Sequence, residues 1–117
     1  MPQVELPDIA DLCLGSVLLA TGGGGDPHVA QLMCESAIKK FGPVSLQDMN
    51  EVDDNALVVA LGEVGAPSVS LEQLPRGDEA ALAMHRMQQF LGRSITHLVP
   101  FEVGGANSLI PLVAAAE

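Results

Sequence analysis

The sequence predicts an α/β fold of the three-layer α/β/α kind, in which helices cover both faces of a mostly parallel sheet. Two short and mainly apolar runs, 56–61 and 95–101, are typical of central parallel strands. The segment between them, 78–91, has a helical period and the length of a right-handed crossover. We expect residues 1–117 to be the N-terminal portion of one α/β domain, with the sheet incomplete in this chain.

The other elements follow from apolar periodicity and from helix start and stop signals. Asp26 and Pro27 suit the N-cap and first position of a helix that ends before Gly42. The expected elements are a helix at 9–20, a helix at 28–41, a short strand at 44–46, an acidic turn at 47–55, a helical turn at 69–74 and a helix at 109–116. Residues 17–21 would also suit a buried strand.

The helical stripes predict which residues face the core. They include Leu18, Leu19, Leu32 and Leu82. The last helix, 109–116, is short and apolar, and a helix of that length gains its stability from packing. We expect its partner surface to come from chain that is missing here or from a second copy, which would make the protein a homo-oligomer.

Composition excludes several classes of protein. The net charge is −10, and the few basic residues form no patch that would attract a nucleic-acid backbone. The two cysteines, Cys13 and Cys34, have neither zinc-site nor disulfide-scaffold spacing, so we expect free thiols. No apolar run is long enough for a membrane span, and the first residues lack a signal-peptide pattern. We therefore expect a cytoplasmic protein with no nucleic-acid or membrane partner.

Three glycine-rich turns, 21–27, 62–68 and 102–108, are the candidate binding elements. Two of them follow strands, and parallel strands open their carboxyl ends on one edge of a sheet, where such folds bind ligands. Bare amides beside helix N-termini also suit an anion or a developing negative charge. The candidate substrate-binding residues are Thr21, Gly22, Gly23, Gly24, Gly25, Glu63, Gly65, Ala66, Pro67, Gly104, Gly105, Asn107 and Ser108.

Two carboxylates are candidate general bases. Glu102 is the first choice, because it ends an apolar strand and precedes two glycines that leave it uncrowded. Asp26 is the second candidate base, although a role as a helix cap is the favoured interpretation of that residue. Glu63 would equally suit a solvent-exposed position, and Asn107 and Ser108 suit caps as well as ligand contacts. The phosphate-loop and dinucleotide motifs are absent, so no nucleotide is expected, and no ligand set requires a metal.

Four segments together resemble the S-methyl thiohydantoin desulfurase family. They are 8–12, 21–27, 65–69 and 100–108, with Ser68 standing where the family pattern has threonine. The resemblance implies an N-terminal α/β domain in a protein about three times as long, followed by a β-rich domain. It also implies a functional association with hydantoinase and oxoprolinase proteins.

The resemblance further implies a reaction: hydrolysis of an S-methylated thiohydantoin, a small heterocyclic substrate, with release of methanethiol. Water would add to the ring carbon that bears sulfur, while Glu102 or Asp26 takes the proton and glycine-turn amides stabilise the developing charge. A metal-bound hydroxide would do the same chemistry. The competing hypotheses are a non-catalytic α/β domain for metabolite binding or assembly, and a fragment that has no activity alone.

Overall fold

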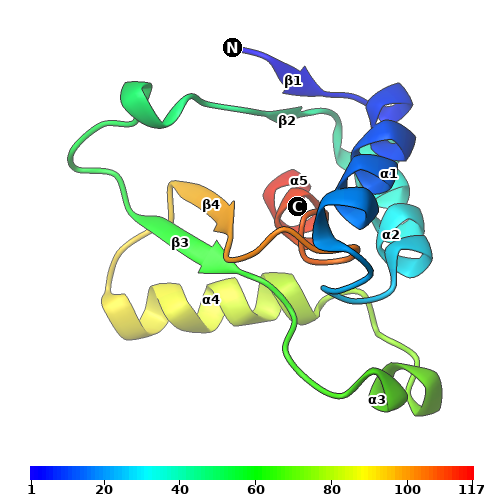
Figure 1. Ribbon diagram of the computed structural model, residues 1–117. Helices are drawn as coiled ribbons and strands as arrows, with labels where there is room; N and C mark the ends of the chain where they lie inside the picture. The colour runs from blue at the N-terminus through cyan, green and yellow to red at the C-terminus, as the bar shows by residue number, and fades with distance from the viewer.

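The protein folds as a mixed α/β structure with two separate two-stranded sheets (Figure 1). The computed structural model describes the backbone of residues 1–117 and all side chains except those of Pro67 and Ser70. The elements are β1 (Gln3–Val4), η1 (Leu6–Asp8), α1 (Ile9–Ala20), α2 (Pro27–Phe41), β2 (Val44–Ser45), η2 (Met49–Glu51), β3 (Val58–Leu61), α3 (Pro67–Glu72), α4 (Glu79–Leu91), β4 (His97–Pro100) and α5 (Ile110–Ala116).

The predicted parallel pair is confirmed. Strands β3 and β4 run parallel, with a register that begins at Val58 opposite His97. The pairing is extended at its amino end by Thr96, whose hydroxyl accepts a hydrogen bond from Leu57 N at 2.9 Å and donates one to Leu57 O at 3.1 Å. The carboxyl ends of both strands therefore lie side by side, as the turn argument requires.

A second pair, β1 with β2, is antiparallel and forms its own sheet. The strand at Val44–Ser45 was predicted, but its partner Gln3–Val4 was not, because two residues carry no periodicity. The pairing places Val4 and Val44 in the core, where they are 4% and 7% exposed. The described residues thus contain one parallel and one antiparallel pair rather than one mostly parallel sheet.

The core lies among α1, α2 and α5. Helix α2 turns its small residues inward, and Ala30, Cys34 and Ala37 are at most 5% exposed. These side chains let α5 approach closely, and α2 packs mainly against α1 and α5. Helices were expected to cover the faces of a parallel sheet, whereas α2 packs mainly on other helices.

Helix α5 finds its partner surface within the chain. Leu109 is fully buried, and Ile110 and Val113 are each 3% exposed. The helix packs against α2, α4 and β4. The expectation that missing chain or a second copy would cover α5 is corrected accordingly.

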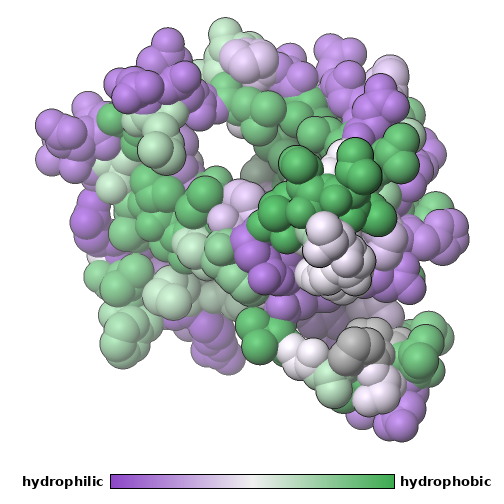
Figure 2. All heavy atoms as spheres, viewed as in Figure 1, coloured by the Kyte–Doolittle hydropathy of each residue, from purple (hydrophilic) through white to green (hydrophobic). Residues whose placement is uncertain are grey.

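Apolar surface remains exposed on other elements. Leu14, Leu18 and Leu19 of α1 are 70%, 76% and 72% exposed, and Figure 2 shows apolar residues gathered at the surface over this helix. Leu32 of α2 and Leu82 of α4 are about half exposed as well. The predicted core faces were wrong at these leucines. In α1 and α2 the buried stripe includes small side chains of alanine, cysteine and serine instead. Helix α4 has no buried residue among its described side chains.

The parallel strands are also only partly covered. Val58 of β3 is 47% exposed and Val99 of β4 is 40% exposed, although central strands bury both faces. Helix α5 lies against β4 and leaves part of the pair open.

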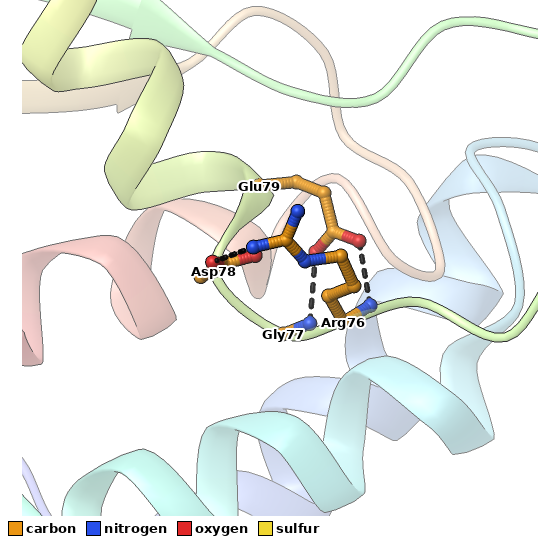
Figure 3. A network of polar contacts seen from close by, with 4 residues as sticks. All are labelled: Arg76, Gly77, Asp78 and Glu79. Carbon is orange, nitrogen blue, oxygen red and sulfur yellow. Dashed lines mark hydrogen bonds and ion pairs between the residues drawn. The ribbon is translucent and has the colours of Figure 1, made fainter.

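A polar network fixes the start of α4 (Figure 3). The Glu79 carboxylate accepts hydrogen bonds from Arg76 N at 2.6 Å and Gly77 N at 2.9 Å. The Arg76 guanidinium in turn donates to Asp78 Oδ2 at 2.7 Å. The amide bonds, with the Arg76 bond as the largest cause, lower the pKa of Glu79. A carboxylate at a helix start also complements the helix dipole.

Among the described helices, none combines the length and the apolar character that crossing a bilayer requires.

Candidate functional site

The first and third glycine turns are joined by main-chain hydrogen bonds. Gly105 N donates to Gly23 O at 3.0 Å. Gly24 O accepts from both Ala106 N at 2.8 Å and Asn107 N at 3.0 Å. The loop after α1 and the loop after β4 therefore form one unit. This unit and residues 62–63 together are called the turn junction.

Glycine is required where these two turns touch. Gly24 has φ +79°, and a Cβ added to it would lie 2.1 Å from Gly104 Cα. A Cβ on Gly104 would lie 2.6 Å from Gly24 Cα. Gly25, at φ +94°, packs in the same way against the Ala106 methyl group. Any side chain at Gly24 or Gly104 would push the two backbones apart.

The second turn is attached to the junction by Asn107. Its Oδ1 accepts a hydrogen bond from Glu63 N at 2.7 Å, and its Nδ2 donates to Glu63 O at 3.1 Å. Asn107 is 2% exposed. Gly62 precedes this contact and lies against the Phe101 ring, which leaves no room for a Cβ. The carboxyl ends of β3 and β4 are thus clamped together by one buried amide.

Glu102 lies at the edge of the junction. Its Oε1 accepts a hydrogen bond from Asn107 Nδ2 at 2.7 Å, and the residue is otherwise solvent-exposed. A carboxylate in this position is oriented at one oxygen and accessible to solvent. It can accept a proton from a water molecule bound beside it.

Asp26 acts as a helix cap. Its Oδ1 accepts from His28 N at 2.9 Å and from Val29 N at 3.4 Å, at the start of α2. Thr21 ends α1 in the left-handed conformation, with φ 52°. The capping interpretation of Asp26 is therefore confirmed, and its carboxylate is held at the start of α2.

Most amides of the third turn are used inside the protein. Gly104 N donates to Ser108 Oγ at 3.1 Å, while the amides of Gly105 and Asn107 donate to the first turn. The Gly104 and Gly105 amides therefore have hydrogen-bond partners within the protein and hold the junction together. The backbone of Gly22 and of Gly65 has open space beside it, since a Cβ built on either residue meets nothing within 4 Å.

The remaining predicted substrate-binding residues, 65–67, belong to the second glycine turn outside the turn junction. Gly65 and Ala66 are exposed ahead of α3, and among the described contacts no hydrogen bond joins them to the first or third turn. The Pro67 side chain lies outside the described residues. In the part of the chain that the structure describes, no three His, Cys, Asp or Glu side chains are grouped as a metal site.

Two hollows of the described surface are lined by residues outside the turn junction. One, of about 420 Å³, is lined by Asp8, Leu12, Ser16 and their neighbours on α1. The other, of about 220 Å³, lies between α4, β4 and α5. A pocket that is common to the three glycine turns therefore stays a prediction.

Most residues of the turn junction were predicted from the sequence, but three of its contacts were not. Ala106 and Phe101 were not singled out, although each contacts a turn glycine. Gly62 could have been found, because it stands directly at the end of β3. Asn107 was singled out as a cap or a ligand contact, and its contacts with Glu63 and Glu102 were not expected from the sequence.

Comparison with known families identifies the class of protein that carries these features. Residues 7–117 match the family described as S-Me-THD-like, N-terminal domain. The chain belongs to this family, which confirms the resemblance seen in the sequence. No curated protein and no solved structure matches the chain.

Proposed function

We propose that this chain is part of a hydrolase that acts on S-methyl thiohydantoins and releases methanethiol. The observation that carries the proposal is the exposed Glu102 carboxylate, held by Asn107 at the turn junction of an S-Me-THD-like chain. General-base catalysis needs a positioned carboxylate within hydrogen-bond reach of the attacking water.

The reaction balances with one water molecule. Glu102 takes a proton from water while the water oxygen bonds to the ring carbon that bears the S-methyl group. The electrons of the ring C=N bond move to the ring nitrogen. The tetrahedral intermediate then expels methanethiolate as the C–O bond becomes a carbonyl. The hydroxyl proton and the proton held by Glu102 go to the ring nitrogen and the thiolate. The products are the hydantoin and methanethiol.

The substrate ring is assigned to the open side of the first two turns. Gly22 and Gly65 have free space beside their backbone, where a flat ring can approach closely. Glu63 and Thr21 supply polar groups near these positions. The Gly104 and Gly105 amides hold the junction and are not assigned to the ring.

A second candidate function is a non-catalytic domain for metabolite binding or assembly. The interlocked turns favour the assembly role within this alternative, because the amides of Gly105 and Ala106 form hydrogen bonds inside the protein. In this case Glu102 would be a surface carboxylate with no part in chemistry.

Methanethiol release separates the two functions. The 117-residue chain and a longer family member that contains the same junction are incubated with an S-methyl thiohydantoin, and methanethiol and hydantoin are both quantified. The corresponding hydantoin, which lacks the leaving group, is the control substrate. Equal amounts of both products support the hydrolase. Binding of the substrate without release supports the second function.

Further proposals concern the whole protein. We propose that the chain is the N-terminal portion of a longer protein whose three-layer sheet extends the β3–β4 pair, since Val58 and Val99 leave strand surface uncovered. We also propose a homo-oligomer that associates with hydantoinase or oxoprolinase proteins. Cys13 and Cys34 are free and buried, which suits the reducing cytoplasm.

A further inference from the structure

We propose that Asn107 is a positioning residue, which holds the Glu102 carboxylate and ties it to the end of β3, and that it does not contact the substrate. The inference rests on the proposed function for the role of Glu102. It deepens that function, because it names the group that fixes the base.

The first argument is saturation of the Asn107 side chain. A primary amide offers two N–H donors and one carbonyl oxygen. The oxygen accepts from Glu63 N, and Nδ2 donates to both Glu63 O and Glu102 Oε1. The residue is 2% exposed, so a substrate would have to displace one of these bonds.

The second argument is mechanical. Asn107 N donates to Gly24 O, while its side chain binds Glu63 at the end of β3 and Glu102 just after β4. One residue therefore connects all three turns. Glu102 is exposed, and without this bond its side chain would lose the contact that selects one rotamer.

The third argument is the direction of the hydrogen bond. Asn107 donates and the carboxylate accepts, and a bond to an ionised acceptor is about twice as strong as one between neutral groups. Asparagine is also neutral, so it orients Glu102 without adding a charge. Aspartate at position 107 would keep the size and the acceptor for Glu63 N, but would place a second carboxylate against Glu102.

A double-mutant cycle of unfolding free energies tests the contact between Asn107 and Glu102 independently of activity. Unfolding of the 117-residue chain is measured for wild type, Asn107→Asp, Glu102→Gln and the double variant. Asn107→Asp should lower the folding equilibrium constant about tenfold. Glu102→Gln alone should change it by about twofold or less, since its amide oxygen still accepts. In the Asn107→Asp background, Glu102→Gln should restore part of the loss, because its Nε2 can donate to the new carboxylate, while the bond from Asn107 Nδ2 to Glu63 O stays lost.

Steady-state kinetics test the positioning role of Asn107. In the longer enzyme, Asn107→Asp and Asn107→Ser should lower kcat about tenfold or more with KM changed by about twofold or less, as misplacing a base does. The control is Thr96→Val, which removes the matching clamp at the amino ends of β3 and β4. It should lower stability while kcat and KM stay unchanged.

The outcomes are distinct. A raised KM with unchanged kcat in Asn107→Ser would assign Asn107 to substrate binding and overturn the proposal. Equal effects of Glu102→Gln in both backgrounds would overturn the direct contact. If Asn107→Asp does not fold, the cycle is run with Asn107→Ser and Glu102→Ala, both of which remove the hydrogen bond, and a direct contact predicts that their effects on stability are not additive. Absence of methanethiol release by the wild-type enzyme would remove the proposed function, while the stability cycle still decides the contact.

Discussion

Gly24 and Gly104 lie backbone to backbone, so close that a methyl group on Gly24 would fall 2.1 Å from Gly104 Cα. The contact joins the loop after α1 to the loop after β4, and it is reinforced by the two hydrogen bonds that Gly24 O accepts. The junction that carries Glu102 depends on this approach.

Alanine substitutions in the glycine run should therefore differ sharply in cost. Gly24→Ala combines a clash with backbone and a left-handed φ, and we expect a loss of about 2–4 kcal/mol. Gly23→Ala is the matched control, since its Cβ would meet only Ala20 O at an ordinary 3.5 Å. It should cost about 1 kcal/mol or less. Chemical denaturation measures both, and equal losses would contradict the close approach.

The Glu79 network predicts a pH-dependent stability. The pKa of Glu79 is lowered in the folded state, chiefly by the Arg76 amide bond. The carboxylate therefore stabilises the fold above its unfolded pKa, and this contribution is lost as pH falls through the lower folded pKa. Because the group is exposed, Glu79→Gln should cost only about 0.5–1 kcal/mol at pH 7. The difference from wild type should disappear in acid, and a constant difference at every pH would contradict this account.

The thiol of Cys34 should be protected from alkylation. Burial first, and the charge of Glu35 second, raises the pKa of Cys34 to about 11. The protonated thiol therefore contributes stability that is complete below the unfolded value of 9.0 and is lost as pH rises toward the folded value. At pH 8, labelling of the native chain should be about tenfold slower or more than in denaturant. Cys34→Ala removes this protected signal, and equal native and unfolded rates would contradict the burial.

The exposed leucines of α1 predict self-association. Leu14, Leu18 and Leu19 are at least 70% exposed and form an uncovered apolar surface (Figure 2). Replacing Leu14 and Leu18 by glutamine should lower the mass measured by light scattering toward that of the monomer. Thermal stability should change little, because these side chains make few core contacts. A wild-type chain that is already monomeric at high concentration would contradict this prediction.

Local signals in the sequence predicted the elements well. Asp26 and Pro27 start α2 through two amide bonds to the Asp26 carboxylate, as the capping pattern indicated. The apolar runs around Val58 and Leu98 predicted the parallel pair with the correct direction. The cap is decided by neighbouring residues, and the direction of the strand pair follows from the helical segment that connects the two strands.

The buried faces and the junction could not be predicted in the same way. Leu18 and Leu19 looked like core residues, but Cys13 and Ser16 face the other helices, because small side chains permit the close contact. The sequence likewise shows that Gly24 and Gly104 are glycines but not that they touch each other. Such pairings depend on tertiary contacts between distant segments.

The most direct test of the central claim is the turnover of Glu102→Gln in the longer enzyme, measured as methanethiol release from an S-methyl thiohydantoin. The substitution keeps the hydrogen bond from Asn107 and removes only the ability to take a proton, so we expect turnover to fall about a hundredfold or more. Thr96→Val serves as the control with intact chemistry. Unchanged turnover in Glu102→Gln would contradict the assignment, and a loss in Asp26→Asn instead would transfer the role to that residue.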